Sequence, residues 1–148
     1  MRLVPVAELG IDVRWYLWTL LLEREPHTVI SHKITTFEEH LAFFKSQPYR
    51  LWFVIEDDAQ NWVGQLSVTK RNEIGIQIAK VHRRRGYARA ALELLLHAHK
   101  PLDAVPGEVP GNYIANIAPS NEASIALFHG FDAKLIQYTF EIPRGTHA

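Results

Sequence analysis

Cysteine is absent from this 148-residue sequence. The absence excludes a disulfide framework, metal sites built from thiolates and a cysteine nucleophile. It is also typical of proteins from a reducing compartment, and we expect a cytoplasmic location. The histidine and acidic residues show no spacing typical of a metal site, so we expect no metal.

An excess of charge is lacking as well. Sixteen basic and sixteen acidic residues cancel, so no overall field would hold the chain on nucleic acid or on an anionic membrane. The run Arg83 to Arg85 is a local basic cluster, but no second basic patch accompanies it. We therefore expect neither nucleic acid nor a membrane as a partner.

Long hydrophobic runs are also missing. The longest apolar stretch, Trp15 to Leu22, is interrupted only by Thr19 and is far shorter than the roughly 20 residues that cross a bilayer. Residues 1–10 lack the regions of a signal peptide. Hydrophobic residues make up 47% of the sequence, enough for a real core, and the length predicts a single domain over residues 1–148.

Hydrophobic periodicity and turn residues predict the elements of the first half. They are a strand over Arg2–Val6, a helix over Asp12–Glu25, a loop over His27–Thr35, a helix opening at Thr36, and strands over Arg50–Glu56 and Trp62–Thr69. Thr36 and Glu39 form a capping-box pattern. The polar residues Asp57 to Asn61 predict a hairpin turn between the two strands.

The second half alternates strands with helices. It predicts a strand over Asn72–Lys80, a helix over Gly86–His99, a loop over Lys100–Asn112, a strand over Tyr113–Ala118, a helix over Asn121–His129 and one or two strands within Phe131–Ile142. The order β-α-α-β-β-β-α-β-α-β indicates a mixed α/β fold with at least one crossover around the fourth strand.

The most informative stretch is EIGIQIAKVHRRRGYARAALELLLHA, residues 73–98. A strand runs into a short basic turn, and a helix leaves immediately. This arrangement directs unpaired backbone N–H groups and the positive end of the helix dipole at one point, which suits a pyrophosphate. Gly86 and Ala88 carry little side chain to keep a ligand from the backbone.

These residues resemble a known family. Residues 83–88, RRRGYA, match the Q/R-x-x-G-x-G/A signature of the GNAT superfamily of acyl-CoA-dependent N-acyltransferases. Residues 114–131, IANIAPSNEASIALFHGF, are similar to its second conserved segment. The resemblance covers nearly the whole chain. It implies a mixed central sheet of six or seven strands with about four helices, in which the parallel fourth and fifth strands splay apart.

The resemblance also implies an acetyl-CoA site in that opening. The turn from Arg84 to Arg89 would cradle the pyrophosphate, and the backbone of residues 76–78 would pair with the pantetheine arm and polarise the thioester carbonyl. Asn121 would bind the pantetheine, with Ser124 beside it. The implied cofactor-binding residues are Ile76, Gln77, Ile78, Arg83, Arg84, Arg85, Gly86, Tyr87, Ala88, Arg89, Asn121 and Ser124.

The sequence departs from the family where a general acid is expected. Many members place a tyrosine on the last helix to protonate the leaving thiolate, and the corresponding residue here is Phe128. A thiol has a pKa of about 8.5, so its thiolate is a tolerable leaving group without an acid. Water, Tyr113, Tyr138 or His129 are the alternatives.

The general base is open as well. Some members carry a glutamate just before or on the fourth strand, where Glu73 lies, and others carry one on the fifth strand, where Asn116 stands. His40 and His82 are rivals to Glu73. The candidate catalytic residues are thus Glu73 and His40. Because Phe128 and Asn116 do not titrate, a non-catalytic acyl-CoA-binding module is an alternative reading.

The acceptor wall is implied to lie in residues 12–46. Residues 30–58, ISHKITTFEEHLAFFKSQPYRLWFVIEDD, look like the corresponding part of enzymes that acetylate nucleotide-linked amino sugars. The prediction is an N-acetyltransferase acting on the primary amine of a small acceptor, with a lean to an amino sugar or sugar nucleotide. Protein N-termini, lysines, amino acids, polyamines and aminoglycoside-type drugs remain alternatives. A homodimer is compatible with the scattered aromatic residues, although nothing specifies one.

Overall fold

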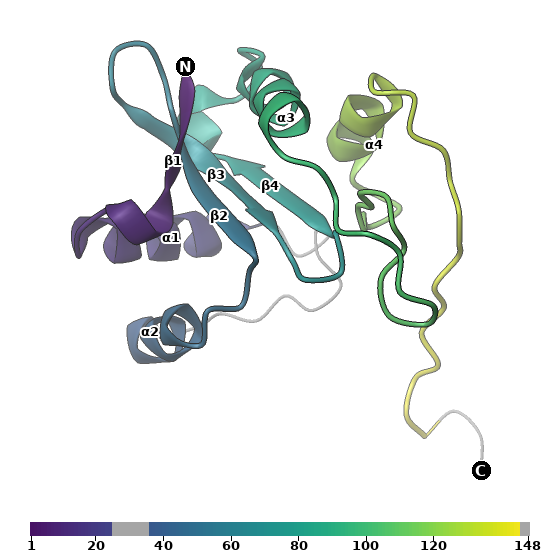
Figure 1. Cartoon of the computed structure of the whole chain (residues 1–148). Coiled ribbons are helices and arrows are strands. Elements are labelled where there is room, and N and C mark those ends of the chain that lie inside the picture. The colour runs from purple at the N-terminus through teal and green to yellow at the C-terminus, as the bar shows by residue number, and fades with distance from the viewer. Residues whose placement is uncertain (25–35, 146–148) are drawn as a thin grey trace.

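A single antiparallel sheet forms the centre of the molecule (Figure 1). The computed structural model describes residues 1–24 and 36–145, so the predicted loop over His27–Thr35 lies outside the described residues. The strands follow the order β1-β2-β3-β4. Their bounds are Arg2–Pro5 for β1, Leu51–Glu56 for β2, Trp62–Val68 for β3 and Ile74–Ile78 for β4.

The predicted hairpin turn between β2 and β3 is confirmed. One carboxylate oxygen of Asp57, Oδ1, accepts hydrogen bonds of 2.9 Å from the backbone N–H groups of Ala59 and Asn61. An aspartate that bonds its own backbone in this way fixes a turn without help from the rest of the fold. The turn therefore sets the register in which Val54 lies opposite Gln65.

Four helices and two 3₁₀ turns complete the described chain, and the number of helices agrees with the prediction. Their bounds are Val6–Glu8 for η1, Asp12–Leu22 for α1, Phe37–Lys45 for α2, Lys80–His82 for η3, Tyr87–Ala98 for α3 and Glu122–His129 for α4. The capping box is confirmed at its first bond, 3.1 Å from Glu39 N–H to Thr36 Oγ1. Within the described ranges, no helix is both long and apolar enough to cross a membrane.

The two faces of the sheet carry separate cores because neighbouring strand residues point to opposite sides. Phe53 and Ile55 of β2 pack with Leu92 and Leu95 of α3 on one face. Val54, between them, packs with α1 on the other face. Figure 1 shows α1 and α2 on the side of the sheet opposite α3. The alternation in β2 thus holds a helix against each face.

The expectation of six or seven strands is wrong, because the described sheet has four strands, all antiparallel. Tyr113–Ala118 forms no strand. It contributes one parallel bridge, between Glu73 and Ile114. The bridge is made by hydrogen bonds of 2.8 Å from Ile74 N–H to Ile114 O and 3.0 Å from Ile114 N–H to Asn72 O. The expected pair of splayed parallel strands is therefore reduced to this bridge.

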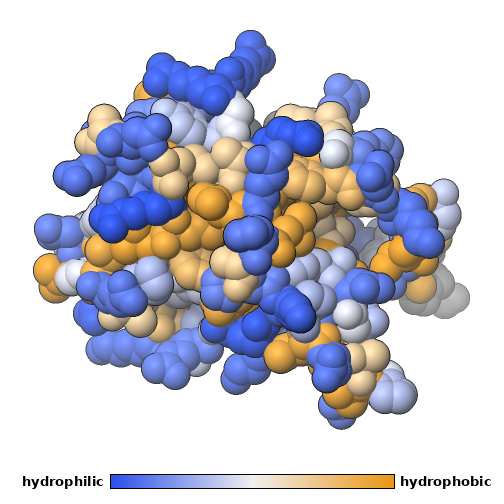
Figure 2. Space-filling model, turned by 45° about the horizontal axis from the view of Figure 1, so that its top comes forward, coloured by the Kyte–Doolittle hydropathy of each residue, from blue (hydrophilic) through white to orange (hydrophobic). Residues whose placement is uncertain are grey.

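Phe131–Ile142 also forms no strand, contrary to expectation. Its side chains from residue 132 onward are exposed, including Tyr138 and Phe140, and the segment runs away from the sheet (Figure 1). Apolar alternation makes a strand only where a neighbouring edge supplies backbone partners. Figure 2 shows a band of hydrophobic surface bordered by hydrophilic side chains, so the described chain leaves part of its apolar surface uncovered.

Candidate functional site

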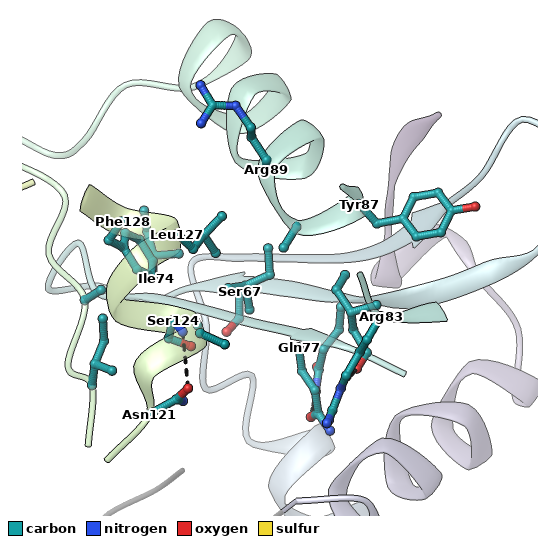
Figure 3. A pocket seen from close by; sticks show the side chains of 18 of the residues that line it. Ser67, Ile74, Gln77, Arg83, Tyr87, Arg89, Asn121, Ser124, Leu127 and Phe128 are labelled. Carbon is teal, nitrogen blue, oxygen red and sulfur yellow. Dashed lines mark hydrogen bonds between the residues drawn. The ribbon is translucent and has the colours of Figure 1, made fainter. Parts of the chain in front are cut away.

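A cleft of about 770 Å³ runs along the free edge of β4. One wall, called here the β4–α3 wall, comprises β4 and the start of α3. The other, the α4 wall, comprises residues 115–117 and the inner side of α4. Figure 3 shows Ser124, Leu127 and Phe128 of α4 on the side facing Ile74. The single bridge at Ile114 closes one end, and beyond it the two walls separate.

The edge of β4 offers unpaired backbone groups to the cleft. In an antiparallel strand, successive residues direct their N–H and C=O groups alternately to the two sides. Ile74 N–H bonds Ile114 O, and Ile78 O accepts a 3.1 Å bond from Arg83 Nε, so both residues point away from β3. Ile76 lies between them with the same orientation. Its N–H and C=O therefore face the cleft, where an extended amide-bearing ligand would pair with them.

The start of α3 has no side-chain cap. The first hydrogen bond of the helix is 3.1 Å, from Ala90 N–H to Gly86 O, which leaves the N–H groups of residues 87–89 without partners inside the helix. Gly86 has φ +80°, and Arg84 also has a left-handed φ of 63°. Backbone amides that converge at a helix start bind anions. This turn is thus a site for a phosphate-bearing ligand.

Gly86 is required for its conformation, and no neighbouring protein atom restricts it. A Cβ added at this position would meet nothing within 4 Å, whereas a φ of +80° is unfavourable for any residue with a side chain. The expectation that the small size of Gly86 also admits a ligand to the backbone stays a prediction. The glycine shapes the turn that aims the amides.

The arginines of the turn differ in their placement. Arg83, Arg84 and Arg89 line the cleft, whereas Arg85 does not. Arg89 pairs with Glu93 at 3.2 Å, and its guanidinium lies 5.0 Å from the centre of the Phe131 ring, so it links α3 to the end of α4. Three cationic side chains beside the open amides strengthen the attraction for phosphate.

Asn121 and Ser124 lie on the opposite wall and face the cleft. The side-chain oxygen of Asn121 accepts a 3.2 Å bond from Ser124 N–H and caps α4 (Figure 3). The amide nitrogen of Asn121 keeps two donors for a ligand. The side-chain oxygen of Asn121 therefore caps α4, and its amide nitrogen can donate to a ligand.

Glu73 lies where the two walls meet. Its backbone forms the parallel bridge to Ile114, and its side chain, 34% exposed, lies 3.9 Å from Arg71 Nε. It is the only acidic residue among the described residues that line the cleft. A carboxylate so placed is available to take a proton from a bound amine.

His40 does not line the cleft. It is 1% exposed, and its Nε2 lies 3.0 Å from Arg14 O, so α2 is tied to α1. Its Nδ1 is buried without a partner. Burial lowers the pKa of His40, with a smaller opposing effect from the bond to Arg14. The ring is therefore held neutral inside the α1–α2 contact.

The other predicted proton-handling positions are also located. Phe128, Asn116 and His82 line the cleft, whereas Tyr113, Tyr138 and His129 do not. The Tyr113 hydroxyl donates to His99 O at 3.2 Å instead. Ser124 is the hydroxyl-bearing residue of α4 that lines the cleft. Within residues 1–24 and 36–145, no group of three or more histidine or acidic side chains could hold a metal.

Several lining residues were not identified as site residues from the sequence. Tyr49, Gln65 and Ser67 line the part of the cleft on the α1 side of the sheet, beside Arg24, which falls within the predicted acceptor segment 12–46. Gln65 and Ser67 are two apart in β3, so both project from the same face. A polar pair at this spacing inside an apolar strand was the available signal. In the sequence it resembles an ordinary solvent-facing side of a sheet, so the pattern alone does not indicate a site.

Comparisons with known proteins agree with this geometry. Residues 13–133 match the family model of the acetyltransferase (GNAT) domain. No curated protein matches the sequence. Among solved structures, a ribosomal-protein-alanine N-acetyltransferase from Brucella melitensis has a TM-score of 0.62 at 19% identity, covering 88% of this chain and 83% of that one.

Two further solved structures are similar. A spermidine N-acetyltransferase from Vibrio cholerae, in complex with CoA and spermine, has a TM-score of 0.58 at 18% identity and covers 87% of this chain and 78% of that one. An N-acetyltransferase from Staphylococcus aureus Mu50 has a TM-score of 0.58 at 19% identity and covers 84% and 79%. At such identities the likeness establishes the fold.

Proposed function

The chain belongs to the GNAT acetyltransferase family, and from this premise we propose how its cleft transfers an acetyl group to the primary amine of a small acceptor. The protein is an acetyl-CoA-dependent N-acetyltransferase. The observation that carries the proposed geometry is the pairing of an uncapped helix start at Gly86 with the free strand edge at Ile76 along one cleft. CoA consists of a phosphate-bearing nucleotide and an extended pantetheine arm that contains amides, which match these two features.

The start of α3 would hold the pyrophosphate. The amides of residues 87–89 and the positive end of the helix dipole favour negative charge at this point. Arg84 and Arg89 line the same part of the cleft and would supply charge-assisted hydrogen bonds. Arg85 lies outside the lining, so its contribution would be limited to long-range attraction.

The edge of β4 would hold the pantetheine arm. Ile76 N–H and C=O match the alternating donors and acceptors of its amides, and the free amide nitrogen of Asn121 would donate from the opposite wall. A backbone N–H at the thioester carbonyl would stabilise the negative charge that develops there. Ile78 continues this edge toward the turn with its N–H, since its C=O accepts from Arg83 Nε, whereas the backbone of Gln77 faces β3.

Glu73 is the proposed general base. The amine must attack in its neutral form, and Glu73 would accept the proton that the ammonium group loses. Acetyl-CoA supplies the activated acetyl group: the amine nitrogen bonds to the carbonyl carbon while the C–S bond breaks and its electron pair leaves on sulfur. The second proton that the nitrogen then loses passes to the departing thiolate or to water. Phe128 has no proton to donate. With a thiol pKa of about 8.5, the sulfur can leave as a thiolate.

His40 is not proposed as the base. It is buried between α1 and α2 and absent from the cleft lining, so a role in catalysis would need a movement of both helices. Asn116 and Phe128 line the cleft, and neither side chain titrates. This is the basis of the alternative that the chain is a non-catalytic CoA-binding module. Glu73 in the cleft favours the enzyme.

The acceptor would enter from the α1 side of the sheet. Tyr49, Gln65 and Ser67 provide hydroxyl and amide groups there, which would suit a hydroxylated acceptor such as the amino sugar or sugar nucleotide favoured by the sequence. Ribosomal-protein alanine and spermine, named for the similar structures, define the competing classes of protein N-termini and polyamines.

The test is release of free CoA from acetyl-CoA as amines of each class are added. The proposal expects amine-dependent release with at least one small acceptor, and mass spectrometry should find one acetyl group on its nitrogen. Tight CoA binding with no release for any amine would instead support the non-catalytic module.

Two further expectations stay predictions. The exposed apolar side chains of residues 135–142 are suited to self-association, and sedimentation at increasing concentration would detect a homodimer. The cytoplasmic location inferred from the lack of cysteine is tested by fractionating cells that express the tagged chain.

A further inference from the structure

An arginine that pairs with no carboxylate of the described residues lies on the acceptor side of the cleft. Arg24 follows α1 directly, lines the cleft and places its Nε 3.5 Å from the side-chain oxygen of Gln77. Among residues 1–24 and 36–145, no ion pair joins Arg24 to a carboxylate. Burial lowers the pKa of Arg24, and nearby Tyr49 opposes this effect. Withdrawing an unpaired charge from water is unfavourable, so its placement calls for a reason.

The residues around Arg24 are fixed by hydrogen bonds. The amide nitrogen of Gln77 donates to Leu20 O at 2.5 Å, so its oxygen is directed toward Arg24 and toward Gln65 Nε2, each at 3.5 Å. Gln65 in turn accepts a 2.9 Å bond from Trp52 Nε1. This network orients the guanidinium, and among the described residues no further hydrogen bond engages its terminal nitrogens.

Two hydroxyl groups lie on the same side of the sheet. Tyr49 and Ser67 both line the cleft; burial raises the pKa of Tyr49, with smaller opposing effects from Arg24 and from the Ser67 side chain. Gly75 lies opposite Ser67 in the strand pairing, and a Cβ there would come within 2.9 Å of Ser67 Oγ. The glycine therefore keeps the serine hydroxyl uncovered (Figure 3).

The charge of the cleft lining distinguishes between acceptor classes. Glu73 is the sole acidic residue among the described lining residues, against four arginines, Arg24, Arg83, Arg84 and Arg89. A polyamine would bring a second and a third positive charge, and the acceptor side would meet these with Arg24. Like charges held together disfavour binding. The lining thus selects against a polycation.

We propose that Arg24, with the hydroxyls of Tyr49 and Ser67, forms an anion subsite for the acceptor, which carries a carboxylate or phosphate beside the amine that is acetylated. This inference rests on the proposed function. A guanidinium presents paired donors that match either group, and the hydroxyls add further donors. Arg24 thereby determines specificity, while Glu73 handles the proton.

Matched acceptor pairs test the subsite and separate the two anion sources. Alanine against alaninamide isolates a carboxylate, and glucosamine 6-phosphate against glucosamine isolates a phosphate; spermidine represents the polycations. The expected result is a kcat/KM about 30-fold higher for the anionic member of at least one pair, which is about 2 kcal/mol of transition-state binding. Equal rates within both pairs, or a preference for spermidine, would overturn the proposal.

Variants then assign the preference to Arg24. Arg24→Gln should remove the advantage of the anionic acceptor while changing the KM for acetyl-CoA by less than about twofold, and Arg24→Lys should restore part of it. Because the variant removes a half-buried charge that has no acidic partner among the described residues, its melting temperature should not fall. Arg14→Gln is the matched control, since it removes the same charge from α1 at a residue outside the cleft lining. An anionic preference that survives in Arg24→Gln would refute the assignment.

Calorimetry with acetyl-CoA separates failure of the subsite from failure of the proposed function. If acetyl-CoA binds and release of CoA occurs only with uncharged or cationic amines, or with none of the five probes, the anion subsite is wrong and the coenzyme site stands. If acetyl-CoA does not bind, the proposed geometry fails first and the subsite fails with it.

Discussion

The two walls of the cleft differ in how firmly the fold holds them. The β4–α3 wall is continuous with the main core, where Ala91, Leu92 and Leu95 of α3 are buried against the sheet. The α4 wall contains no buried residue, and no described residue after Leu95 is buried. Its Leu127 and Phe128 are partly buried and pack against the main core, and its backbone is joined to the sheet by one parallel bridge at Ile114.

The difference indicates that the two walls have separate roles in binding the coenzyme. A wall built into the core keeps its amides in place before any ligand arrives, so binding requires little ordering there. A wall with few buried contacts opens at low cost, and elements with few buried apolar contacts lie at the low-stability end of a protein. We infer that the β4–α3 wall provides a preformed coenzyme site and that the α4 wall closes upon it.

The largest effect is expected at Glu73, where the walls meet. Glu73→Gln keeps the backbone bridge and the side-chain shape but removes the base. We expect kcat to fall about 100-fold to 1000-fold while CoA affinity changes by less than about twofold. Steady-state rates and calorimetry measure the two quantities. A kcat reduced by less than tenfold would show that another group takes the proton.

The preformed wall is tested at Gly86. Gly86→Val places a branched side chain at a φ of +80°, and the turn must shift because such a conformation costs about 1–2 kcal/mol even for unbranched residues. We expect CoA affinity to fall about 10-fold to 30-fold. Gly86→Asn is the control, because asparagine tolerates left-handed φ and a Cβ meets nothing within 4 Å. Equal losses in both variants would contradict the conformational role.

The α4 wall should respond more weakly. Asn121→Ser keeps an oxygen that can cap α4 but removes the amide donors, and one lost hydrogen bond is worth about 0.5–1.5 kcal/mol. CoA affinity should fall by a factor of about 2 to 10. Asn121→Ala removes the cap as well, so faster amide exchange in α4 should accompany its loss of affinity. A larger effect than that of Gly86→Val would reverse the roles assigned to the walls.

His40 lies outside both walls and should affect stability alone. Because burial lowers its pKa below the ordinary 6.5, the unfolded chain binds more protons than the folded one as the pH falls below that value. Its contribution to stability is therefore fully present above pH 6.5 and is lost on acidification. Urea unfolding at pH 7.5 and 5.5 should show less acid sensitivity in His40→Gln, with kcat/KM at pH 7.5 unchanged. A large loss of kcat/KM would point to catalysis instead.

The sequence predicted the β4–α3 wall well and the α4 wall only in part. The alternation of Ile74, Ile76 and Ile78 and the apolar stripe of α3 are local signals that the core reinforces. The stretch over Tyr113–Ala118 has the same local appearance, but a strand also needs a neighbouring edge, and after Ile114 the chain diverges from β4. A single sequence shows the residue pattern of a strand, but it does not show which neighbouring strand would pair with it.

The residues on the acceptor side of the cleft were harder to predict from the sequence, for a different reason. Arg24 lies just beyond a helix end, and nothing in its neighbours shows that the guanidinium turns back over β4. Its position depends on Gln77, 53 residues away. His40 was also hard to place from the sequence, because a polar residue on an amphipathic helix is normally directed to solvent or to a site. The contact between α1 and α2 buries this one instead.

The account depends most on the backbone amides at the start of α3. An amide-resolved NMR titration with CoA observes them directly, and Gly86 and its neighbours to residue 89 serve as the reporters. We predict their largest shifts with intact CoA and much smaller shifts with a pantetheine fragment that lacks the phosphates. If CoA binds and these amides do not respond, the pyrophosphate lies elsewhere and the account is wrong.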